Sequence, residues 1–301
     1  MSTLAVYLRS GYLPAEELLE LAPVVEALGF DGMSVPEHSL LPDYTDRTYP
    51  YAADGQPPFD VHAVFPDPLV VIGALAAVTS RLRFVTGVYL LPLRHPIHVA
   101  KAVATAANIS GGRVSFGVGV GWLRDEFDSI GLTFSQRGQL TSESIAAIRA
   151  LWEPGPAEFR GRHYSFGPLF LEPRPLLPIP ILVGGVSDAA IARAVSLGDG
   201  LILPHLDVDE AAQVLGRLQA ALSQTGRDPA GFEVHALADD VPGRTEMGLV
   251  ALGVDAVYVQ GWPNPARHKT TVPQKIAALE EYADKYLGQL RERSPRAAAG
   301  G

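Results

Sequence analysis

The stretch that decides the fold is residues 179–203, IPILVGGVSDAAIARAVSLGDGLIL. A short apolar run from Ile179 to Val183 is followed by a helical pattern from Ala189 to Leu197 and by a second apolar run from Gly200 to Leu203. Two such runs joined by one helix are typical of a βαβ unit in a parallel sheet. The pair Gly184-Gly185 stands where the first strand ends, just before the helix.

The same alternation extends along the whole chain. We expect eight strands, at Leu4 to Leu8, Asp31 to Val35, Leu82 to Leu91, Arg113 to Val118, Ile179 to Val183, Gly200 to Leu203, Phe232 to Leu237 and Val254 to Gln260. Eight βα units in succession favour a closed (β/α)8 TIM barrel over an open doubly wound sheet. Two segments interrupt the pattern, a long loop from Pro36 to Pro66 after strand two and an insertion from Glu153 to Pro178 before strand five.

Length and composition indicate one α/β domain over residues 1–301. The chain is 47% hydrophobic and 19% charged, which suits a large buried core. A single barrel commonly takes ~250 residues, so the length does not require a second domain. The tail after Arg291 consists largely of small residues at its end, and we expect it to be frayed.

Charge and residue usage exclude several classes of function. The net charge of -9 and the absence of a Lys and Arg block argue against a nucleic-acid partner. The chain has no cysteine, so it has no disulfide and no Cys-ligated metal, and redox chemistry requires an imported cofactor. No signal-like segment and no apolar run of ~18 residues is present, and we expect a cytoplasmic protein that does not enter a membrane.

The fourth strand runs into a series of alternating glycines, Gly117-Val118-Gly119-Val120-Gly121-Trp122. This series resembles a dinucleotide fingerprint, but Trp122 stands where a third glycine or alanine is required, and the unit is the fourth rather than the first. Gly119 and Gly121 remain candidates for close contact with a cofactor, because glycine lets a backbone approach a ligand. The alternative is that small residues are needed for packing inside the barrel.

The ends of strands five, three and two also carry candidate site residues. After strand five, Gly184, Gly185 and Ser187 precede a helix start and could hold a phosphate, although Ser187 could instead be a plain N-cap. Strand three contains Gly87 and is followed by two prolines, which indicates a bulge, and Arg94 beyond it is either a partner for an acidic cofactor group or a surface arginine.

Strand two ends in Pro36-Glu37-His38, which places an imidazole at the rim of the expected barrel. Histidine can exchange a proton near neutral pH or donate to a developing anion. His38 is therefore our candidate catalytic residue, against the alternative that it is a solvated loop side chain.

Several motifs in order resemble the luciferase-like monooxygenase superfamily, and within it the branch of F420-dependent oxidoreductases. The motifs are Ser110-Gly111-Gly112-Arg113-Val114, Gly117 to Phe127, Arg137-Gly138, Leu91 to Pro96 with Ala100-Lys101, Glu172 to Pro175, Pro178 to Gly185 and Leu197 to Gly200. The resemblance covers the chain from the first strand to about the eighth.

The resemblance implies a hydride-transfer enzyme that uses coenzyme F420 and acts on a small molecule, commonly as a homodimer. His38 would contact the deazaflavin ring with Glu37 beside it, and a non-prolyl cis peptide around Gly87 and Val88 would support one ring face. The strand-four glycines and Asp125 would border the cofactor. Its phosphate would lie at the group Gly184, Gly185 and Ser187.

One departure leaves alternatives open. The sugar-phosphate dehydrogenase of this superfamily has an acidic residue directly after the strand-four glycines, where this chain has Trp122. We therefore do not transfer its substrate. The alternatives are an FMN-dependent monooxygenase that uses reduced flavin and oxygen, a non-catalytic deazaflavin-binding protein, and a phosphate-binding barrel lyase or isomerase.

The loop from Pro36 to Pro66 is expected to cover the barrel mouth. Its aromatic residues Tyr44, Tyr49, Tyr51 and Phe59, together with Trp122, offer large apolar faces to a substrate. Long loops within a compact domain are commonly functional, and the loop is predicted to be a lid. The alternative is that its tyrosines pack on neighbouring helices or on a partner subunit.

Overall fold

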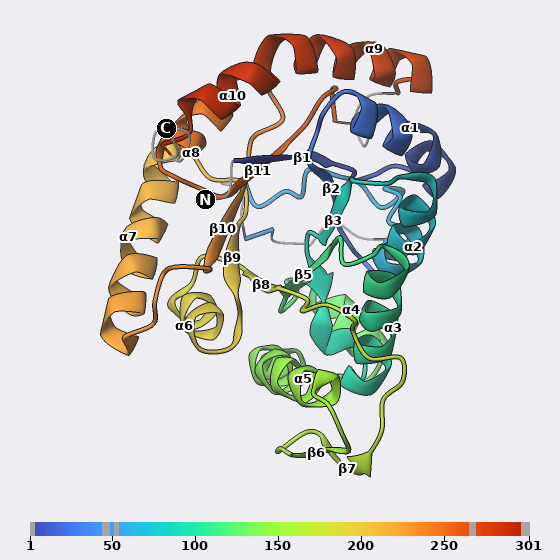
Figure 1. Cartoon of the computed structure of the whole chain (residues 1–301), viewed down its shortest axis with the longest axis vertical. Helices are drawn as coiled ribbons and strands as arrows, with labels where there is room; N and C mark the ends of the chain where they lie inside the picture. Colours follow the sequence, from blue (N-terminus) through green and yellow to red (C-terminus); the bar gives the residue numbers. More distant parts are fainter. Residues whose placement is uncertain (1–3, 44–48, 51–53, 265–268, 296–301) are drawn as a thin grey trace.

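The computed structural model describes residues 4–43, 49–50, 54–264 and 269–295. Its main sheet is a closed parallel barrel with helices around the outside (Figure 1). The barrel strands are β1 (Ala5–Arg9), β2 (Gly32–Val35), β3 (Arg83–Thr86) with β4 (Tyr89–Leu90), β5 (Val114–Gly119), β8 (Ile181–Gly184), β9 (Gly200–Leu203), β10 (Glu233–Leu237) and β11 (Ala256–Val259). Pairing of β1 with β11 and of β3 with β5 closes the ring, which confirms the predicted (β/α)8 fold.

The helices lie outside the barrel and follow the strands in order (Figure 1). Their bounds are α1 (Ala15–Ala27), α2 (Pro68–Val78), α3 (Pro96–Ile109), α4 (Arg124–Ser129), α5 (Arg137–Trp152), α6 (Asp188–Leu197), α7 (Val208–Thr225), α8 (Glu246–Ala251), α9 (Val272–Tyr282) and α10 (Gly288–Arg293). A π-helical turn at Ala283–Leu287 joins α9 to α10. The tail was expected to be frayed after Arg291, but helix α10 continues two residues past that position. Residues 296–301 lie outside the described residues.

The third barrel strand is interrupted, where the sequence predicted one strand from Leu82 to Leu91. Segments β3 and β4 both pair with β5, and the residues between them, Gly87 and Val88, are joined by a cis peptide bond. The resemblance implied a bond of this kind at this place. The interruption lies at the C-terminal end of the barrel, where active sites of barrel enzymes are found.

The insertion before strand five forms an antiparallel hairpin that the sequence did not predict. Strands β6 (Ala157–Arg160) and β7 (Ser165–Leu169) make a separate two-stranded sheet below α5 in Figure 1. The Pro and Gly residues of this segment concealed the strands, because such residues commonly mark loops.

Two apolar layers stabilise the barrel. Large side chains fill its interior, namely Tyr7, Val85, Leu182, Ile202, Ala256 and Tyr258. A larger cluster packs the outer face of the strands against the helices and includes Leu18, Ile72, Val103 and Ile148, all fully buried. The interior is therefore a packed core, and the open end of the barrel is left to loops.

Three aspartates fasten the opposite, N-terminal end of the barrel in the same way. Asp31, Asp199 and Asp255 each precede a strand, and the carboxylate of each accepts a hydrogen bond from the backbone N–H of the first or second residue of a neighbouring strand, at 2.8 to 2.9 Å. The backbone N–H of each aspartate donates to the carbonyl of the same residue, which is Val6, Ile181 or Val234. Such paired bonds fix the register with which adjacent strands begin.

We expect the Asp199→Ala variant to lower the free energy of unfolding by about 1 to 3 kcal/mol, because the buried N–H of Ile181 loses its carboxylate acceptor. Urea unfolding followed by circular dichroism measures the change. The control is Asp128→Ala, an exposed position that we expect to change stability by less than about 0.5 kcal/mol. Equal effects of the two substitutions would contradict this role for Asp199.

Candidate active site

A cavity opens at the C-terminal ends of the barrel strands, below the described parts of the 36–66 loop. Residues from every side of the barrel line it, including Arg9, Ser34, His38, Val88, Gly119, Trp122, Gly185 and His205. It encloses about 190 Å³, less than the ~300–1,000 Å³ of pockets that surround a whole drug-sized ligand. The cavity is thus too small to enclose a whole dinucleotide-sized or flavin-type cofactor, and such a cofactor would extend outside it.

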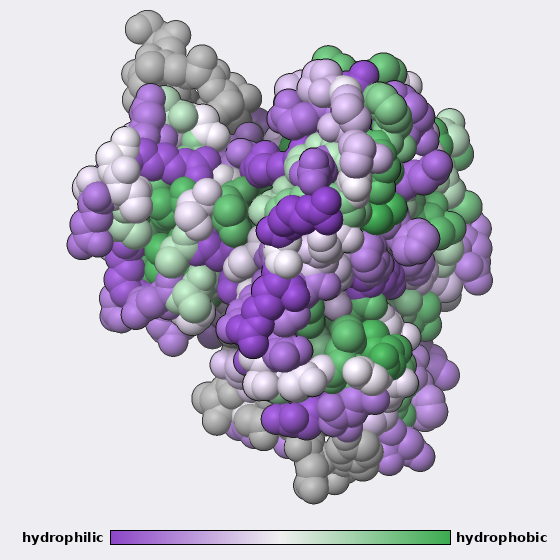
Figure 2. All heavy atoms as spheres, turned by 90° about the horizontal axis from the view of Figure 1, so that it is seen from below, coloured by the Kyte–Doolittle hydropathy of each residue, from purple (hydrophilic) through white to green (hydrophobic). Residues whose placement is uncertain are grey.

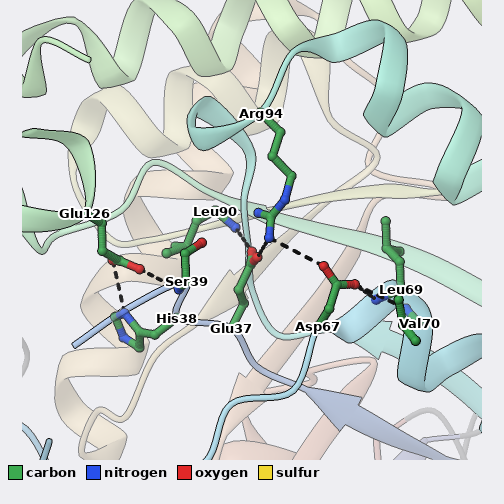
Figure 3. A network of polar contacts seen from close by, with 9 residues as sticks. All are labelled: Glu37, His38, Ser39, Asp67, Leu69, Val70, Leu90, Arg94 and Glu126. Atoms are coloured by element: carbon green, nitrogen blue, oxygen red, sulfur yellow. Dashed lines mark hydrogen bonds and ion pairs between the residues drawn. The ribbon is translucent and has the colours of Figure 1, made fainter. Parts of the chain in front are cut away.

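His38 is held on one wall of this cavity by a buried carboxylate (Figure 3). Its Nδ1 lies 3.1 Å from Oε2 of Glu126, whose side chain is fully buried, and Oε1 of Glu126 accepts the backbone N–H of Ser39 at 2.7 Å. Glu126 lies on α4, so the helix after the strand-four glycines orients the residue after strand two. With Nδ1 engaged, Nε2 is the ring nitrogen left for a ligand.

Aromatic rings surround the imidazole of His38. The ring centroids of Phe59, Phe65 and Trp122 lie 5.3, 5.0 and 5.7 Å from its own. Tyr49 contacts Trp122 in turn, with centroids 5.2 Å apart. Phe59 and Phe65 belong to the 36–66 loop, so the described part of this loop supplies an apolar cover that keeps water away from His38.

Glu37 points away from His38 and binds the interrupted third strand (Figure 3). Its carboxylate accepts the backbone N–H of Leu90 at 2.7 Å and lies 2.5 Å from the guanidinium of Arg94, which also reaches Asp67 at 3.5 Å. Burial raises the pKa of the Glu37 carboxyl, and the charge of Arg94 opposes that rise. The network fixes the end of β2 to the segment that follows Gly87 and Val88.

Glycines make room for Val88 at the floor of the cavity. A Cβ atom on Gly119 would collide with Cγ2 of Val88, and one on Gly184 would lie 2.8 Å from its Cγ1. A Cβ on Gly87 would collide with the hydroxyl oxygen of Ser34. The Val88 side chain is therefore wedged between β5 and β8, and glycines are required at both positions. The packing alternative therefore holds for Gly119, and contact of Gly119 and Gly121 with a cofactor stays a prediction.

Gly121 and Gly185 complete the glycine-rich wall. Their φ angles are +79° and +128°, in the region that side chains rarely adopt. Gly185 leads directly into α6, whose N-cap is Ser187 with its hydroxyl accepting the N–H of Ala190 at 3.2 Å. The hydroxyl hydrogen of Ser187 is still able to donate to an anion.

A second polar group lies on the other wall of the cavity. The guanidinium of Arg9, at the end of β1, lies 2.8 Å from the carboxylate of Asp240. Burial lowers the pKa of neighbouring His205 to about 3, and the charge of Arg9 lowers it too while Asp240 opposes the shift. His205 is thus a neutral imidazole at physiological pH. Asn264 bridges Asp240 and the carbonyl of Pro58, at 3.3 and 3.1 Å.

The structure brings most of the predicted site residues together. Those that line the cavity are Glu37, His38, Tyr49, Phe59, Gly87, Val88, Gly119, Gly121, Trp122, Gly184 and Gly185. Three others do not line it, namely Arg94, Asp125 and Ser187. Arg94 instead forms an ion pair with Glu37, which does line the cavity. Tyr44 and Tyr51 lie outside the described residues.

Sequence reasoning missed several residues of the site. Glu126 lies in the stretch from Gly117 to Phe127 but was given no role, and no signal in the sequence connects it with His38. Arg9 is the last residue of β1, and His205 lies two residues after the end of β9. A systematic inspection of each strand end would have found these two.

Among the described residues, no cluster of His, Cys, Asp or Glu is arranged to hold a metal ion. In the same part of the chain no helix is long and apolar enough to cross a membrane.

A parallel barrel with a cavity at its C-terminal end, lined by glycines and by His38 held against Glu126, has its candidate site where the active sites of barrel enzymes lie. The chain belongs to the luciferase-like monooxygenase family, whose model matches residues 3–299. An uncharacterised protein of Mycobacterium tuberculosis is 33% identical over 280 residues, which cover 90% of this chain and 95% of that protein. The pyrimidine monooxygenase RutA of Escherichia coli is 30% identical over 71% of this chain and 67% of its own length.

Solved structures with low sequence identity share the fold. The monooxygenase RslO1 of Streptomyces bottropensis superposes with a TM-score of 0.77 at 20% identity, over 95% of this chain and 99% of that one. The F420-dependent tetrahydromethanopterin reductase of Methanopyrus kandleri gives 0.70 at 15% identity, over 96% and 99%. An F420-dependent secondary alcohol dehydrogenase gives 0.66 at 19% identity, over 98% and 85%. The family thus includes both monooxygenases and F420 enzymes among its structural relatives.

The contact between His38 and Glu126 predicts the tautomer of the histidine. A carboxylate can only accept, so neutral His38 should carry its proton on Nδ1 and leave Nε2 unprotonated. Imidazole ¹⁵N chemical shifts measure this directly. We expect the Nδ1–H form in the wild type and a mixture of tautomers in Glu126→Gln, whose amide can both donate and accept. A predominant Nε2–H form in the wild type would contradict the arrangement.

Proposed function

We propose that the protein transfers a hydride between the deazaflavin coenzyme F420 and a small organic substrate. The observation that carries the proposal is one cavity lined both by His38, which is held by Glu126, and by Val88 with Gly119 and Gly184 packed against it. The fold relatives named for F420 support this cofactor. The bound cofactor would supply the hydride chemistry.

The residues present fit a cofactor of this shape. Val88, Gly119 and Gly184 would support a planar ring, since they form a smooth apolar floor with close backbone approach. Gly185 and Ser187 would bind its phosphate at the start of α6, where backbone N–H groups and the helix dipole favour an anion. The small volume of the cavity agrees with a ring that is enclosed and a tail that is not.

His38 would manage the proton that accompanies hydride transfer. Oxidation of a substrate by hydride loss releases a proton, and reduction consumes one, so a group near the substrate must take or give it. Nε2 of His38 is the atom placed for this, because Nδ1 is bound to Glu126. Phe59, Phe65 and Trp122 would exclude water, and they would also shape the space for an apolar substrate.

An FMN-dependent monooxygenase is the second candidate. It is favoured by the 30% identity to RutA and by the similarity in fold to RslO1, both of which are named monooxygenases. FMN and F420 share a tricyclic ring and a ribityl phosphate, so the cavity residues alone do not separate them. A deazaflavin-binding protein without turnover is the third candidate. It is motivated by Trp122, which stands where a related enzyme has an acidic residue, but it gives the His38–Glu126 pair no function.

Titration of the apo protein with each cofactor separates the first two candidates. We expect F420 to bind at least tenfold more tightly than FMN, as measured from the change in cofactor fluorescence. Tight FMN binding without F420 binding would replace our proposal by the monooxygenase.

Removal of the imidazole tests the role of His38. We expect His38→Ala to lower turnover of the loaded enzyme by about 100-fold, the usual contribution of a general acid or base, and to change cofactor affinity by less than about threefold. Stopped-flow absorbance with a substrate panel gives the first quantity, and fluorescence titration gives the second. The control is His62→Ala, an exposed histidine of the same loop. Unchanged turnover in His38→Ala would remove His38 from the chemistry.

A further inference from the structure

A second hollow lies outside the barrel, between α5, α6 and the turn of the β6–β7 hairpin. Its basic margin consists of Arg162 and His163 from the hairpin turn and Arg193 from α6, and its floor includes Gly138 and Ser142 of α5. We call this hollow the hairpin groove. Figure 2 looks at the molecule from the end that carries the hairpin, where polar residues cover much of the surface.

The guanidinium charges of the two arginines in the hairpin groove are not neutralised by an ion pair within the described residues. Nε of Arg193 donates to the hydroxyl of Ser142 at 2.9 Å and its Nη2 to the carbonyl of Gly138 at 3.1 Å. Both acceptors are neutral, and burial lowers the pKa of Arg193. Neither Arg193 nor exposed Arg162 forms an ion pair with a carboxylate of the described residues. Nε2 of His163 is buried and has no hydrogen-bond partner in that part of the chain.

The carboxylate that lies in the hairpin groove is already engaged. Glu143 accepts the backbone N–H groups of Arg162, His163 and Tyr164 at 3.1, 2.7 and 2.6 Å. These three bonds hold the hairpin turn against α5. These bonds direct the Glu143 carboxylate at the backbone of the turn. The side chains of Arg162 and Arg193 therefore remain available to an anionic ligand.

The hairpin groove and the proposed phosphate site are connected by helix α6. Gly184 and Gly185 line the cavity, and α6 begins immediately after them at Asp188. Arg193 lies five residues further along the same helix, about 8 Å from its start at 1.5 Å per residue. An extended chain that leaves the helix start therefore needs only a few bonds to reach the hairpin groove.

From these contacts, and resting on the proposed function, we infer that the hairpin groove binds the carboxylates of the glutamate tail of F420. In this coenzyme the phosphate continues through a lactyl group into a chain of glutamates, whereas FMN ends at the phosphate. Arg162 and Arg193 would pair with tail carboxylates, and Nε2 of His163 would contribute a hydrogen bond. The groove would thus select the deazaflavin over FMN by a part of the molecule remote from the ring.

The test compares two forms of the deazaflavin, one with the glutamate tail and one that ends at the phospholactate. Fluorescence titration of the apo protein gives the affinity for each. We expect the wild type to bind the tailed form about tenfold more tightly. Arg162→Gln and Arg193→Gln should each weaken binding of the tailed form roughly threefold to fivefold, the upper part of the range for exposed ion pairs, and leave the tail-less form within twofold.

The matched control is Arg160→Gln, because Arg160 lies on the same hairpin but is exposed and paired with Glu158 at 2.9 Å. It should bind both forms as the wild type does. Arg162→Gln decides the matter even if Arg193→Gln fails to fold, since the Arg162 side chain is exposed. Equal wild-type affinity for the two forms, or equal losses for both forms in the variants, would overturn this inference alone. Failure of the wild type to bind either deazaflavin would instead overturn the proposed function.

Discussion

The carboxylate of Glu37 joins the end of β2 to the backbone N–H of Leu90, and Arg94 holds that carboxylate from the other side. This contact sets the position of the interrupted third strand, because Gly87 and Val88 lie between β3 and the residue that Glu37 binds. Val88 can then enter the space between Gly119 and Gly184 only because both lack a side chain. The floor of the cavity depends on this arrangement.

Three groups of polar residues have separate tasks around that floor. Glu37 and Arg94 hold the backbone of the interrupted third strand in place, whereas Glu126 orients His38 on the cavity wall. On the other wall, the pair formed by Arg9 and Asp240 neighbours a histidine, His205, whose pKa lies too low for it to gain charge near neutral pH. Of the histidines that line the cavity, His38 is the one whose surroundings suit proton transfer, which is why the proposed chemistry is centred on it.

The fold could be predicted because strand and helix patterns alternate along the whole chain, as residues 179–203 illustrate. The glycine wall could be predicted because glycines at strand ends are conspicuous. The ion pairs could not, since Glu126 is 88 residues from His38 and Arg94 is remote from Glu37 in sequence, so only the folded barrel brings each pair together. For the same reason the sequence suggested a cofactor partner for Arg94, which the structure places against Glu37.

The central claim is that the cavity wall formed by Val88, Gly119 and Gly184 holds a deazaflavin ring opposite His38. A crystal structure of the protein with reduced F420 tests it most directly. The account predicts density for the ring against Val88, with the reacting face open toward Nε2 of His38 and the phosphate at the start of α6. A ring bound elsewhere, or one whose reacting face is turned away from His38, would contradict it.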